Sequence, residues 1–328
     1  MLLRLELLRA RRRTAGTSWQ LLPRPAETRT TRPRPVIENR TYLFTRRCSE
    51  RRFFLRPDAE VTNAFWYCLA WAARRHGQVL HAAVALSNHV HVIATDPTGL
   101  YPDFLRDFHG RLARVVNAWR GRWEHFWDAN QASAVVLEDE AAQLDKLTYV
   151  VTNPVGLVHK ASDWPGATAL PAIVSGRHIV ARRPKHFFRE DDEGGAMPER
   201  IEVSFQPVPA MAHLSRPEYV ALIQEHVALA EREAAARRRE SGGAVLGRKA
   251  ILAQHWNDRP ADAEPRRQLS PAVACRDKWR RVERLKENKL FQTLYRAAFE
   301  GFRAGMTAVF PLGTWSMRFR ASIQMSTA

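Results

Sequence analysis

A short apolar stretch near residue 90 constrains the fold of this chain more than any other part of the sequence. The letters AVALSNHVHVI lie where two apolar runs, 78–86 and 89–95, are joined tightly around Ser87-Asn88. Runs of this length and character predict two buried strands. Because successive side chains in a strand point to opposite faces, we expect His89 and His91 on the same face of a sheet.

The net charge of the chain indicates which kind of molecule it binds. Its 328 residues carry a formal net charge of +17 with a pI ≈ 10.7, which favours nucleic acid first and an acidic membrane surface second. Residues 1–35 carry nine arginines against two glutamates, and residues 275–328 carry eleven basic against four acidic residues, so each segment has a net charge of +7. We interpret these flanks as phosphate-binding arms. For the first flank, a solvated leader is an equally good interpretation.

Cysteine spacing and hydropathy exclude several other classes of protein. Cys48, Cys68 and Cys275 form no CxxC pair, which argues against a disulfide framework or a thiolate zinc site. Cys68 falls on an apolar helical face and is expected in the core. No stretch approaches the roughly 18 apolar residues of a membrane span, and the start lacks the apolar segment of a secretory signal. We therefore expect a cytoplasmic protein without membrane contact.

Hydrophobic periodicity predicts the order of elements in the first half of the chain. The expected order is strand, helix, strand, strand, helix, strand, helix, at residues 41–47, 57–77, 78–86, 89–95, 103–120, 132–137 and 139–152. This βαββαβ order predicts an α+β, ferredoxin-like fold with an antiparallel sheet and two helices on one face. The other face of the sheet is left for nucleic acid or for the last helix.

Composition predicts three regions. Residues 1–38 read as a basic disordered lead-in, residues 39–175 as the catalytic domain, and residues 176–328 as a basic, mainly helical extension. The acidic, glycine-bearing segment 190–199 is the best linker candidate. Within the extension we expect helices at 217–240, 244–256 and 277–305.

The histidine pair and a later tyrosine together predict chemistry on a phosphodiester. Neutral imidazole is a common metal ligand, so His89 and His91 side by side suit a divalent ion. Tyr149 falls near a helix end, and a phenol oxygen is a competent nucleophile. Asn153 lies four residues later and is the candidate third ligand, although Pro154 disfavours a helical backbone at that position. Because Mg²⁺ prefers oxygen ligands, two histidines shift the expected ion toward Mn²⁺.

Each of these signals has an ordinary structural explanation when taken alone. An HxH strand occurs by chance, a helical tyrosine is commonly a core or surface aromatic, and Asn before Pro commonly just ends a helix. Their combination, in this order and on a basic chain, favours tyrosine attack on a DNA phosphate.

Three segments of the sequence resemble one family. SNHVHVIATDP, YVVTNPVGLV and DWPG together are similar to the REP-associated tyrosine transposases, relatives of the single-tyrosine HUH transposases, over about residues 40–170. The resemblance implies Tyr149 as the nucleophile, His89 and His91 as metal ligands, and Asn153 as the third ligand. The implied reaction cleaves single-stranded hairpin DNA, leaves a 5′-phosphotyrosine and a free 3′-OH, and then transfers the strand.

The chain also departs from the family pattern. It reads NPVGLV where the family commonly continues NPV-x-AGLV, so we expect the loop after Asn153 to be two residues shorter. This difference affects DNA contacts in the loop more than the chemistry. Near the other end, Phe310–Phe319 resembles the C-terminal motif that many members of the family carry.

Basic and aromatic residues around this core are candidate DNA contacts. Four arginines follow the first strand and are predicted to bind DNA phosphates, with a solvated basic turn as the alternative: Arg46, Arg47, Arg51 and Arg52. Trp164 is expected to pack against the sheet rather than to stack on a base.

The sequence therefore predicts a transposase, a DNA strand transferase that requires Mg²⁺ or Mn²⁺ and acts on single-stranded hairpin DNA. The alternative is a domesticated hairpin-binding protein without cleavage activity. The intact His89, His91 and Tyr149 argue against this alternative, and the shorter loop argues for it. A relaxase or replication initiator uses the same chemistry but usually needs a helicase, and nothing here resembles one. Monomer and homodimer both stay open.

Overall fold

The computed structural model describes residues 32–130, 132–186, 197–262, 271–319 and 324–326. Its centre is a sheet in the order β2-β3-β1-β4-β7. The strands are β1 (Arg40–Arg47), β2 (Val79–Leu86), β3 (His89–Asp96), β4 (Ser133–Leu137) and β7 (Val273–Ala274). The first four pair antiparallel, and the short β7 pairs parallel with β4. The fold is thus α+β with a mainly antiparallel central sheet.

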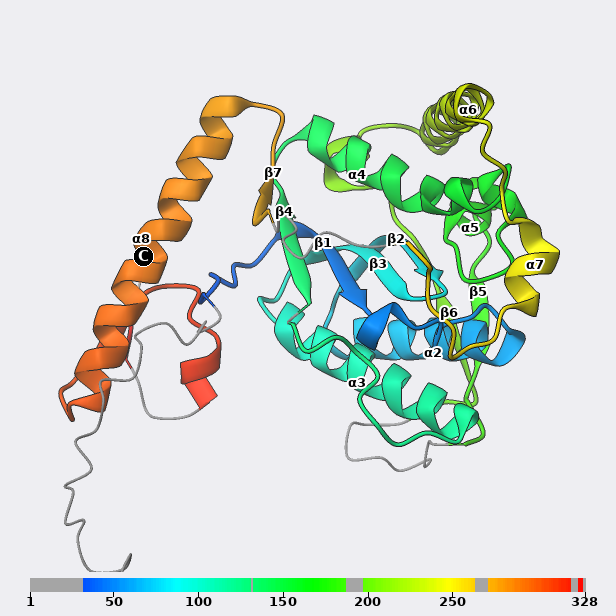
Figure 1. The fold of residues 1–328 in the computed structure, drawn as a ribbon. Coiled ribbons are helices and arrows are strands. Elements are labelled where there is room, and N and C mark those ends of the chain that lie inside the picture. Colours follow the sequence, from blue (N-terminus) through cyan, green and yellow to red (C-terminus); the bar gives the residue numbers. More distant parts are fainter. Residues whose placement is uncertain (1–31, 131, 187–196, 263–270, 320–323, 327–328) are drawn as a thin grey trace, which may run out of the picture. The chain divides into compact units, whose positions relative to one another are not determined.

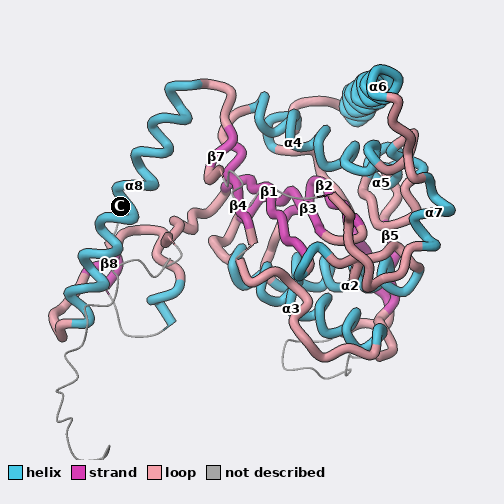
Figure 2. The backbone as a smooth tube through the Cα atoms, viewed as in Figure 1, coloured by secondary structure: helices cyan, strands magenta, loops and turns pink. Residues whose placement is uncertain are grey.

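Helices cover both faces of this sheet (Figures 1 and 2). On one face lie α2 (Ala59–Arg75) and α3 (Tyr101–Arg120), as the sequence predicts for two helices. Tyr42 and Phe44 of β1 point to this side and pack against Tyr101 and Phe104 of α3. The opposite face is covered by α4 (Glu140–Thr152), so the last predicted helix occupies the face that the sequence left open.

Polar side chains at turns set where these helices begin. Asp58 accepts a hydrogen bond from the backbone N–H of Val61 and caps α2. Asp96, fully buried at the end of β3, accepts hydrogen bonds from the backbone N–H groups of Leu100 and Tyr101 at 3.1 and 2.8 Å. This carboxylate therefore satisfies donors at the start of α3 that have no partner within the helix.

The elements after α4 contribute to two hydrophobic clusters, the main core and a smaller cluster around Ala298, Phe310 and Met317. Besides β7, the α-helices and strands among these elements are α5 (Leu170–Ser175), β5 (Ile179–Arg182), β6 (Arg200–Val203), α6 (Arg216–Ser241), α7 (Gly247–Ala253), α8 (Lys278–Arg303), β8 (Val309–Phe310) and β9 (Gln324–Met325). The β5–β6 pair lies against α2 and buries Ala181 and Val203. The region 176–328 thus contains strands as well as the predicted helices, and its first strands share the core of the preceding region. Most of the predicted linker, 190–196, lies outside the described residues.

The DWPG segment packs as the sequence predicts. Trp164 is buried and donates its indole N–H to the backbone oxygen of Ala85 at 3.1 Å. A Cβ atom at Gly166 would lie 2.5 Å from Cβ of Pro57, closer than any side chain allows. Only glycine therefore fits beneath the tryptophan. Cys68 is likewise buried in the core, as expected.

The C-terminal motif contacts the segment before β1 and the start of α3. Val36 donates its backbone N–H to the oxygen of Gly313 at 2.9 Å, and Gly313 has a φ of +88° that favours glycine. Trp315 donates its indole N–H to Asp103 at 3.0 Å. The predicted lead-in, 1–38, lies outside the described residues up to residue 31. Within the described part of the chain, no helix has the length and hydropathy of a membrane span.

Candidate active site

Two histidines lie side by side on β3. A two-residue connection after β2 places His89 at the first position of the strand, and His91 follows on the same face. Their ring centroids are 4.9 Å apart. The alternating residues Val90 and Val92 are buried on the opposite face, toward α2 and α3. The strand pattern alone therefore brings the two imidazoles together, as predicted from their spacing.

The neighbouring strand fixes the orientation of His91. Thr45 of β1 lies directly opposite His91 in the strand register, and its Oγ1 is 2.8 Å from Nδ1 of the imidazole. Burial lowers the pKa of His91 well below its ordinary value of 6.5, and the neighbouring His89 and Lys146 lower it further. His91 is thus neutral at neutral pH. When its Nδ1 donates to Thr45, its Nε2 carries the lone pair.

Helix α4 brings Tyr149 over this pair. The Tyr149 hydroxyl oxygen lies 3.3 Å from Nε2 of His91, and the two ring centroids are 5.2 Å apart. The helix is held against the sheet by the buried side chains of Leu147, Val150 and Val151. Tyr149 itself is 44% exposed, so a macromolecular substrate can reach its hydroxyl. The structure therefore joins the predicted nucleophile to one of the predicted metal ligands.

Asn153 follows Tyr149 on the same helical face. Its backbone is helical, with φ −51° and ψ −35°, and the chain continues as the 3-10 helix η3 (Asn153–Gly156). Pro154 does not prevent a helical backbone at Asn153, because the tight 3-10 turn accommodates the proline in its first turn. Asn153 and Tyr149 line the same cavity. A role for Asn153 as a third metal ligand stays a prediction.

The donor set on β3 fits a divalent metal ion. The two imidazoles share one face, and Asn88 Oδ1 accepts a hydrogen bond from His89 Nδ1 at 2.6 Å, which leaves the lone pair of His89 on Nε2. Among the described residues, no group of three His, Cys, Asp or Glu side chains is arranged to hold a metal. An amide oxygen such as that of Asn153 is a suitable third ligand for a divalent ion.

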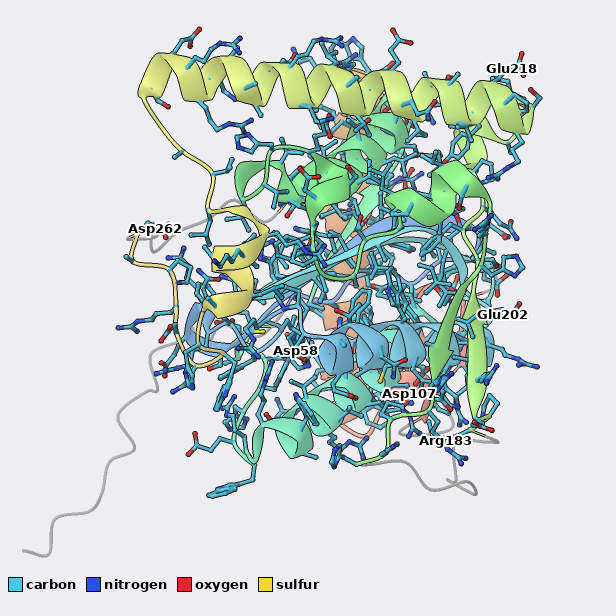
Figure 3. All side chains as sticks on the ribbon, turned by 90° about the vertical axis from the view of Figure 1, so that its right-hand side faces the viewer. Asp58, Asp107, Arg183, Glu202, Glu218 and Asp262 are labelled. Atoms are coloured by element: carbon cyan, nitrogen blue, oxygen red, sulfur yellow. The ribbon has the colours of Figure 1, made fainter. Side chains whose placement is uncertain are left out.

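A cavity of about 370 Å³ adjoins the tyrosine, between α4, η3 and α6. Helix α6 runs across α4 and α5 (Figure 3). It contributes Arg237 and Arg238 to the cavity, and no lining residue carries a carboxylate. Arg238 donates to the backbone oxygen of Val155 at 3.0 Å and so holds η3, the short turn after Asn153.

The four predicted DNA-binding arginines have varied surroundings. Arg46 lies near the Trp127 ring and donates to the backbone oxygen of Asp128. Arg51 forms an ion pair with Asp262 at 2.9 Å, and Arg52 forms one with Glu50 at 2.8 Å.

Arg47 is placed by the strand register directly opposite His89. Because side chains alternate along a strand, Arg47 lies on the same face as the two histidines, whereas Arg46, opposite Val90, lies on the other face. Phosphate contact by the four arginines stays a prediction, and for Arg51 and Arg52 it requires sharing or exchanging the acidic partner.

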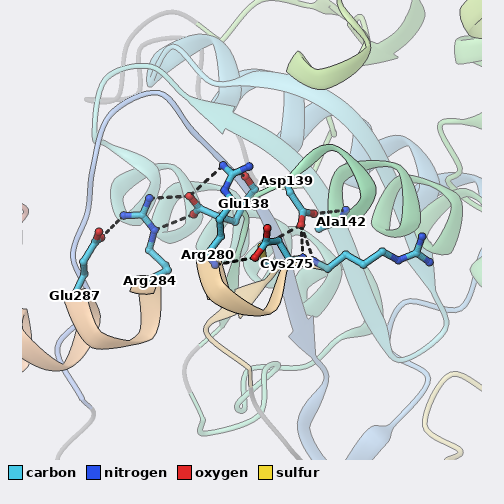
Figure 4. A network of polar contacts seen from close by, with 9 residues as sticks. Glu138, Asp139, Ala142, Cys275, Arg280, Arg284 and Glu287 are labelled. Atoms are coloured by element: carbon cyan, nitrogen blue, oxygen red, sulfur yellow. Dashed lines mark hydrogen bonds and ion pairs between the residues drawn. The ribbon is translucent and has the colours of Figure 1, made fainter. Parts of the chain in front are cut away.

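The start of α4 is tied to the start of α8 (Figure 4). Asp139 caps α4 by accepting from the backbone N–H of Ala142 at 2.8 Å, while its other oxygen accepts from Cys275 Sγ at 3.0 Å and Asp277 N at 3.0 Å. The adjacent Glu138 accepts two hydrogen bonds from Arg284 of α8, at 2.8 and 2.9 Å. The helix that carries Tyr149 therefore shares its N-terminal anchor with the C-terminal segment.

Two features of the site are absent from the sequence prediction. Thr45 contacts His91 because the two residues are opposite each other in the strand register, and a single strand does not show that register. Arg237 and Arg238 belong to an arginine triplet, 237–239, that the sequence marks only as part of a charged helix. The triplet is the one signal that could have drawn attention to this face of α6.

Comparisons with known proteins give structural matches only. A REP-associated tyrosine transposase bound to a REP hairpin matches with 18% identity and a TM-score of 0.39, over 51% of this chain and 96% of that chain. A candidate transposase from Deinococcus radiodurans R1 matches with 18% identity and a TM-score of 0.27, over 37% of this chain and 95% of that chain. No protein-family model and no curated protein matches the sequence. The first structure belongs to the family that the sequence motifs resemble.

Proposed function

We propose that this protein is a metal-dependent tyrosine transposase that nicks single-stranded DNA and joins strands through a 5′-phosphotyrosine intermediate. The observation that carries the proposal is the 3.3 Å distance between Tyr149 Oη and His91 Nε2, two atoms from residues 58 positions apart. Phosphodiester transfer needs a nucleophile beside a site that neutralises the phosphate. The exposed phenol of Tyr149 would supply the nucleophile, and the two neighbouring imidazoles would hold the metal ion that neutralises the phosphate.

Tyr149 performs the bond-making step in this proposal. Its oxygen forms a bond to phosphorus while the bond from phosphorus to the 3′ oxygen breaks. The phenol loses its proton to solvent, and the leaving 3′ oxygen takes one up. The products are a 5′-phosphotyrosine and a free 3′-OH. In strand transfer a second 3′-OH attacks the phosphotyrosine, loses its own proton and releases Tyr149, whose phenolate regains one.

His89 and His91 hold the metal in this proposal, with the side chain of Asn153 as the third ligand. A divalent ion, Mg²⁺ or Mn²⁺, supplies charge neutralisation at the non-bridging phosphate oxygens. Thr45 orients His91 through the hydrogen bond at Nδ1. Partial exposure of Tyr149 keeps its oxygen accessible to a strand that lies across the face of α4.

Charge and topology support the rest of the proposal. The net charge of +17 suits a polyanionic substrate, and we propose single-stranded DNA with a hairpin. We propose that the strands β2-β3-β1-β4, with the helices α2 and α3, form a ferredoxin-like, HUH-type catalytic unit. The short β7 extends this core beside β4.

A denaturing-gel assay for a covalent protein–DNA adduct tests the proposal. The protein is incubated with Mn²⁺ or Mg²⁺ and single-stranded hairpins from the DNA that flanks its own gene. We expect an adduct that survives denaturation and disappears when a chelator removes the metal. Hairpins that are bound but never cleaved, under every metal condition, would support the domesticated binder and overturn the transposase. An adduct that forms fully with chelator present would overturn the metal requirement.

A further inference from the structure

Helix α6 presents one stripe of residues to the cavity beside Tyr149. Its members are spaced so that they share a helical face: Ala230, Ala234, Arg237, Arg238 and Ser241. The small side chains of the two alanines leave room for a ligand, and the two arginines supply positive charge at one end of the stripe. Arg239, two positions after Arg237, falls on the opposite side of the helix and does not line the cavity.

The chemistry of the cavity selects an anionic ligand. Its polar lining consists of guanidinium, hydroxyl and amide groups, and none of its lining residues is acidic. Arg237 is 69% exposed, and its contact with Glu233 at 3.7 Å is an exposed pair that contributes little to stability. A phosphate can displace such a partner. The guanidinium fork also matches the geometry of two phosphate oxygens.

Arg238 has a different task. One of its N–H groups donates to Val155 O at 3.0 Å, so this side chain holds the turn after Asn153 in place. A guanidinium has five N–H donors, and this contact uses one of them. Arg238 therefore shapes the wall of the cavity, and Arg237 is the residue whose exposed charge faces an incoming strand.

We infer that the cavity between α4 and α6 binds the backbone phosphate of single-stranded DNA next to the one that Tyr149 attacks, and that Arg237 is the positioning residue that contacts it. The inference rests on the proposed function, because it takes Tyr149 as the residue that meets the scissile phosphate. Tyr149 belongs to both places: its hydroxyl contacts His91, and its side chain lines the cavity. A strand whose scissile phosphate lies over the histidines therefore continues past Tyr149 into this cavity.

Salt-dependent binding tests the phosphate contact without cleavage. In a Tyr149→Phe background, fluorescence anisotropy measures the binding of a labelled hairpin with a single-stranded flank over a range of salt concentrations. Each lost phosphate contact makes the negative slope of log K against log [salt] shallower by about 0.7 for single-stranded DNA. We expect this loss for Arg237→Ala and a larger loss of affinity for Arg237→Glu. Arg239→Ala and Arg239→Glu are the matched controls, and equal effects at the two positions would overturn the inference.

Methylphosphonate substitution locates the contact along the DNA. One phosphate of the DNA at a time is replaced by its neutral analogue. Adduct formation is then measured with the wild-type protein and with the single variant Arg237→Ala, both of which keep Tyr149. Neutralising the contacted phosphate should slow the wild-type protein and leave the variant unchanged, as in a double-mutant cycle. Coupling at the position adjacent to the cleaved phosphate supports the inference, and coupling elsewhere or nowhere overturns it.

The two proposals fail in different ways. Absence of any adduct with wild-type protein overturns the proposed function, and the salt slope then decides by itself whether the cavity binds phosphate. An adduct that forms equally fast in wild type, Arg237→Ala and Arg239→Ala leaves the proposed function standing and overturns the role of Arg237.

Discussion

The hydroxyl oxygen of Tyr149 lies 3.3 Å from Nε2 of His91, although 58 residues separate them in the sequence. The histidine comes from the second strand of a tight β-strand pair, and the tyrosine comes from a helix that packs across it. In the chain, α3 and β4 lie between them, and β4 is separated from β3 in the sheet by β1. This contact brings together two residues that the sequence predicted separately, and the proposed function rests on it.

Replacing Tyr149 by phenylalanine should abolish the covalent adduct and leave DNA binding within about twofold of wild type, because the removed hydroxyl is the nucleophile and not a major binding group. A denaturing gel measures the adduct, and anisotropy measures binding. Tyr219→Phe is the matched control, since it removes a hydroxyl that is buried in α6 without a hydrogen-bond partner among the described residues. An adduct of normal yield in Tyr149→Phe would exclude this residue as the nucleophile.

Replacing His89 by alanine should lower the rate of adduct formation by more than about a hundredfold, because loss of a metal ligand exceeds the 10–100-fold effect of losing an outer hydrogen bond. The rate is measured at several Mn²⁺ concentrations. His125→Ala, at an exposed position outside the site, serves as the control. Full activity of His89→Ala at low Mn²⁺ would show that His89 does not hold the metal.

Replacing Thr45 by valine should weaken metal binding by roughly 10–100-fold, because the hydrogen bond that orients His91 is lost while the side-chain shape is kept. The measurement is the Mn²⁺ concentration at which adduct formation is half-maximal. Thr41→Val is a matched control on the same strand and face, since Thr41 bonds to Thr95 instead. Equal metal requirements in the two variants would contradict the orienting role of Thr45.

Replacing Asp139 by asparagine should remove a contribution to stability that depends on pH. Burial raises the pKa of Asp139, but hydrogen bonds from Cys275 and from the backbone of Asp277 outweigh it and hold the pKa at about 2, below the ordinary 3.8. A depressed folded-state pKa means that the stabilisation is present above the unfolded value and is lost as pH falls through the folded one.

Urea unfolding of wild type and Asp139→Asn measures this contribution. The two free energies of unfolding should differ at about pH 5 and converge as the pH approaches 2. Asparagine can still cap α4 with its one amide oxygen, but its NH2 group cannot accept from Cys275 and Asp277, so only the part of the difference that changes with pH reports the titration of Asp139. A difference that stays constant over this range would rule out titration of Asp139 as its source.

DNA affinity should fall steeply as salt rises, because basic side chains release counterions when they bind phosphates. The slope of log K against log [salt] counts these contacts at about 0.7 each for single-stranded DNA. Variants of Arg47 and Arg51 measure the share of two predicted contacts from the first strand. A flat response would mean that the net charge of +17 is not used on DNA.

Local signals in the sequence determined much of the sheet and the helices on it. Alternation along β3 was enough to place His89 and His91 on one face, because the side-chain period of a strand is two. Asp58 and Asp139 mark the starts of α2 and α4, since each precedes an apolar helical pattern and can accept a hydrogen bond from the first turn. These properties depend on neighbours within a few residues.

Packing between distant segments decided the rest. The periodicity of α8 predicts a helix, yet the tertiary structure leaves Trp279 75% exposed and Leu290 59% exposed, because a periodic pattern does not specify what the face packs on. The partners of Arg51 and Arg52 were likewise outside the reach of sequence patterns, since charge alone does not distinguish an ion pair from a phosphate contact.

The sequence by itself predicted the residues of the proposed chemistry: an HxH strand, a helical tyrosine and an asparagine four positions later. Only the tertiary structure decided that Thr45 faces His91, that Tyr149 reaches the same imidazole, and that α6 brings Arg237 to the cavity. The physical reason is the distance along the sequence over which each kind of interaction acts. Strand alternation and helix caps are set by adjacent residues, whereas register and helix placement are set by burying apolar side chains from distant parts of the chain against one another.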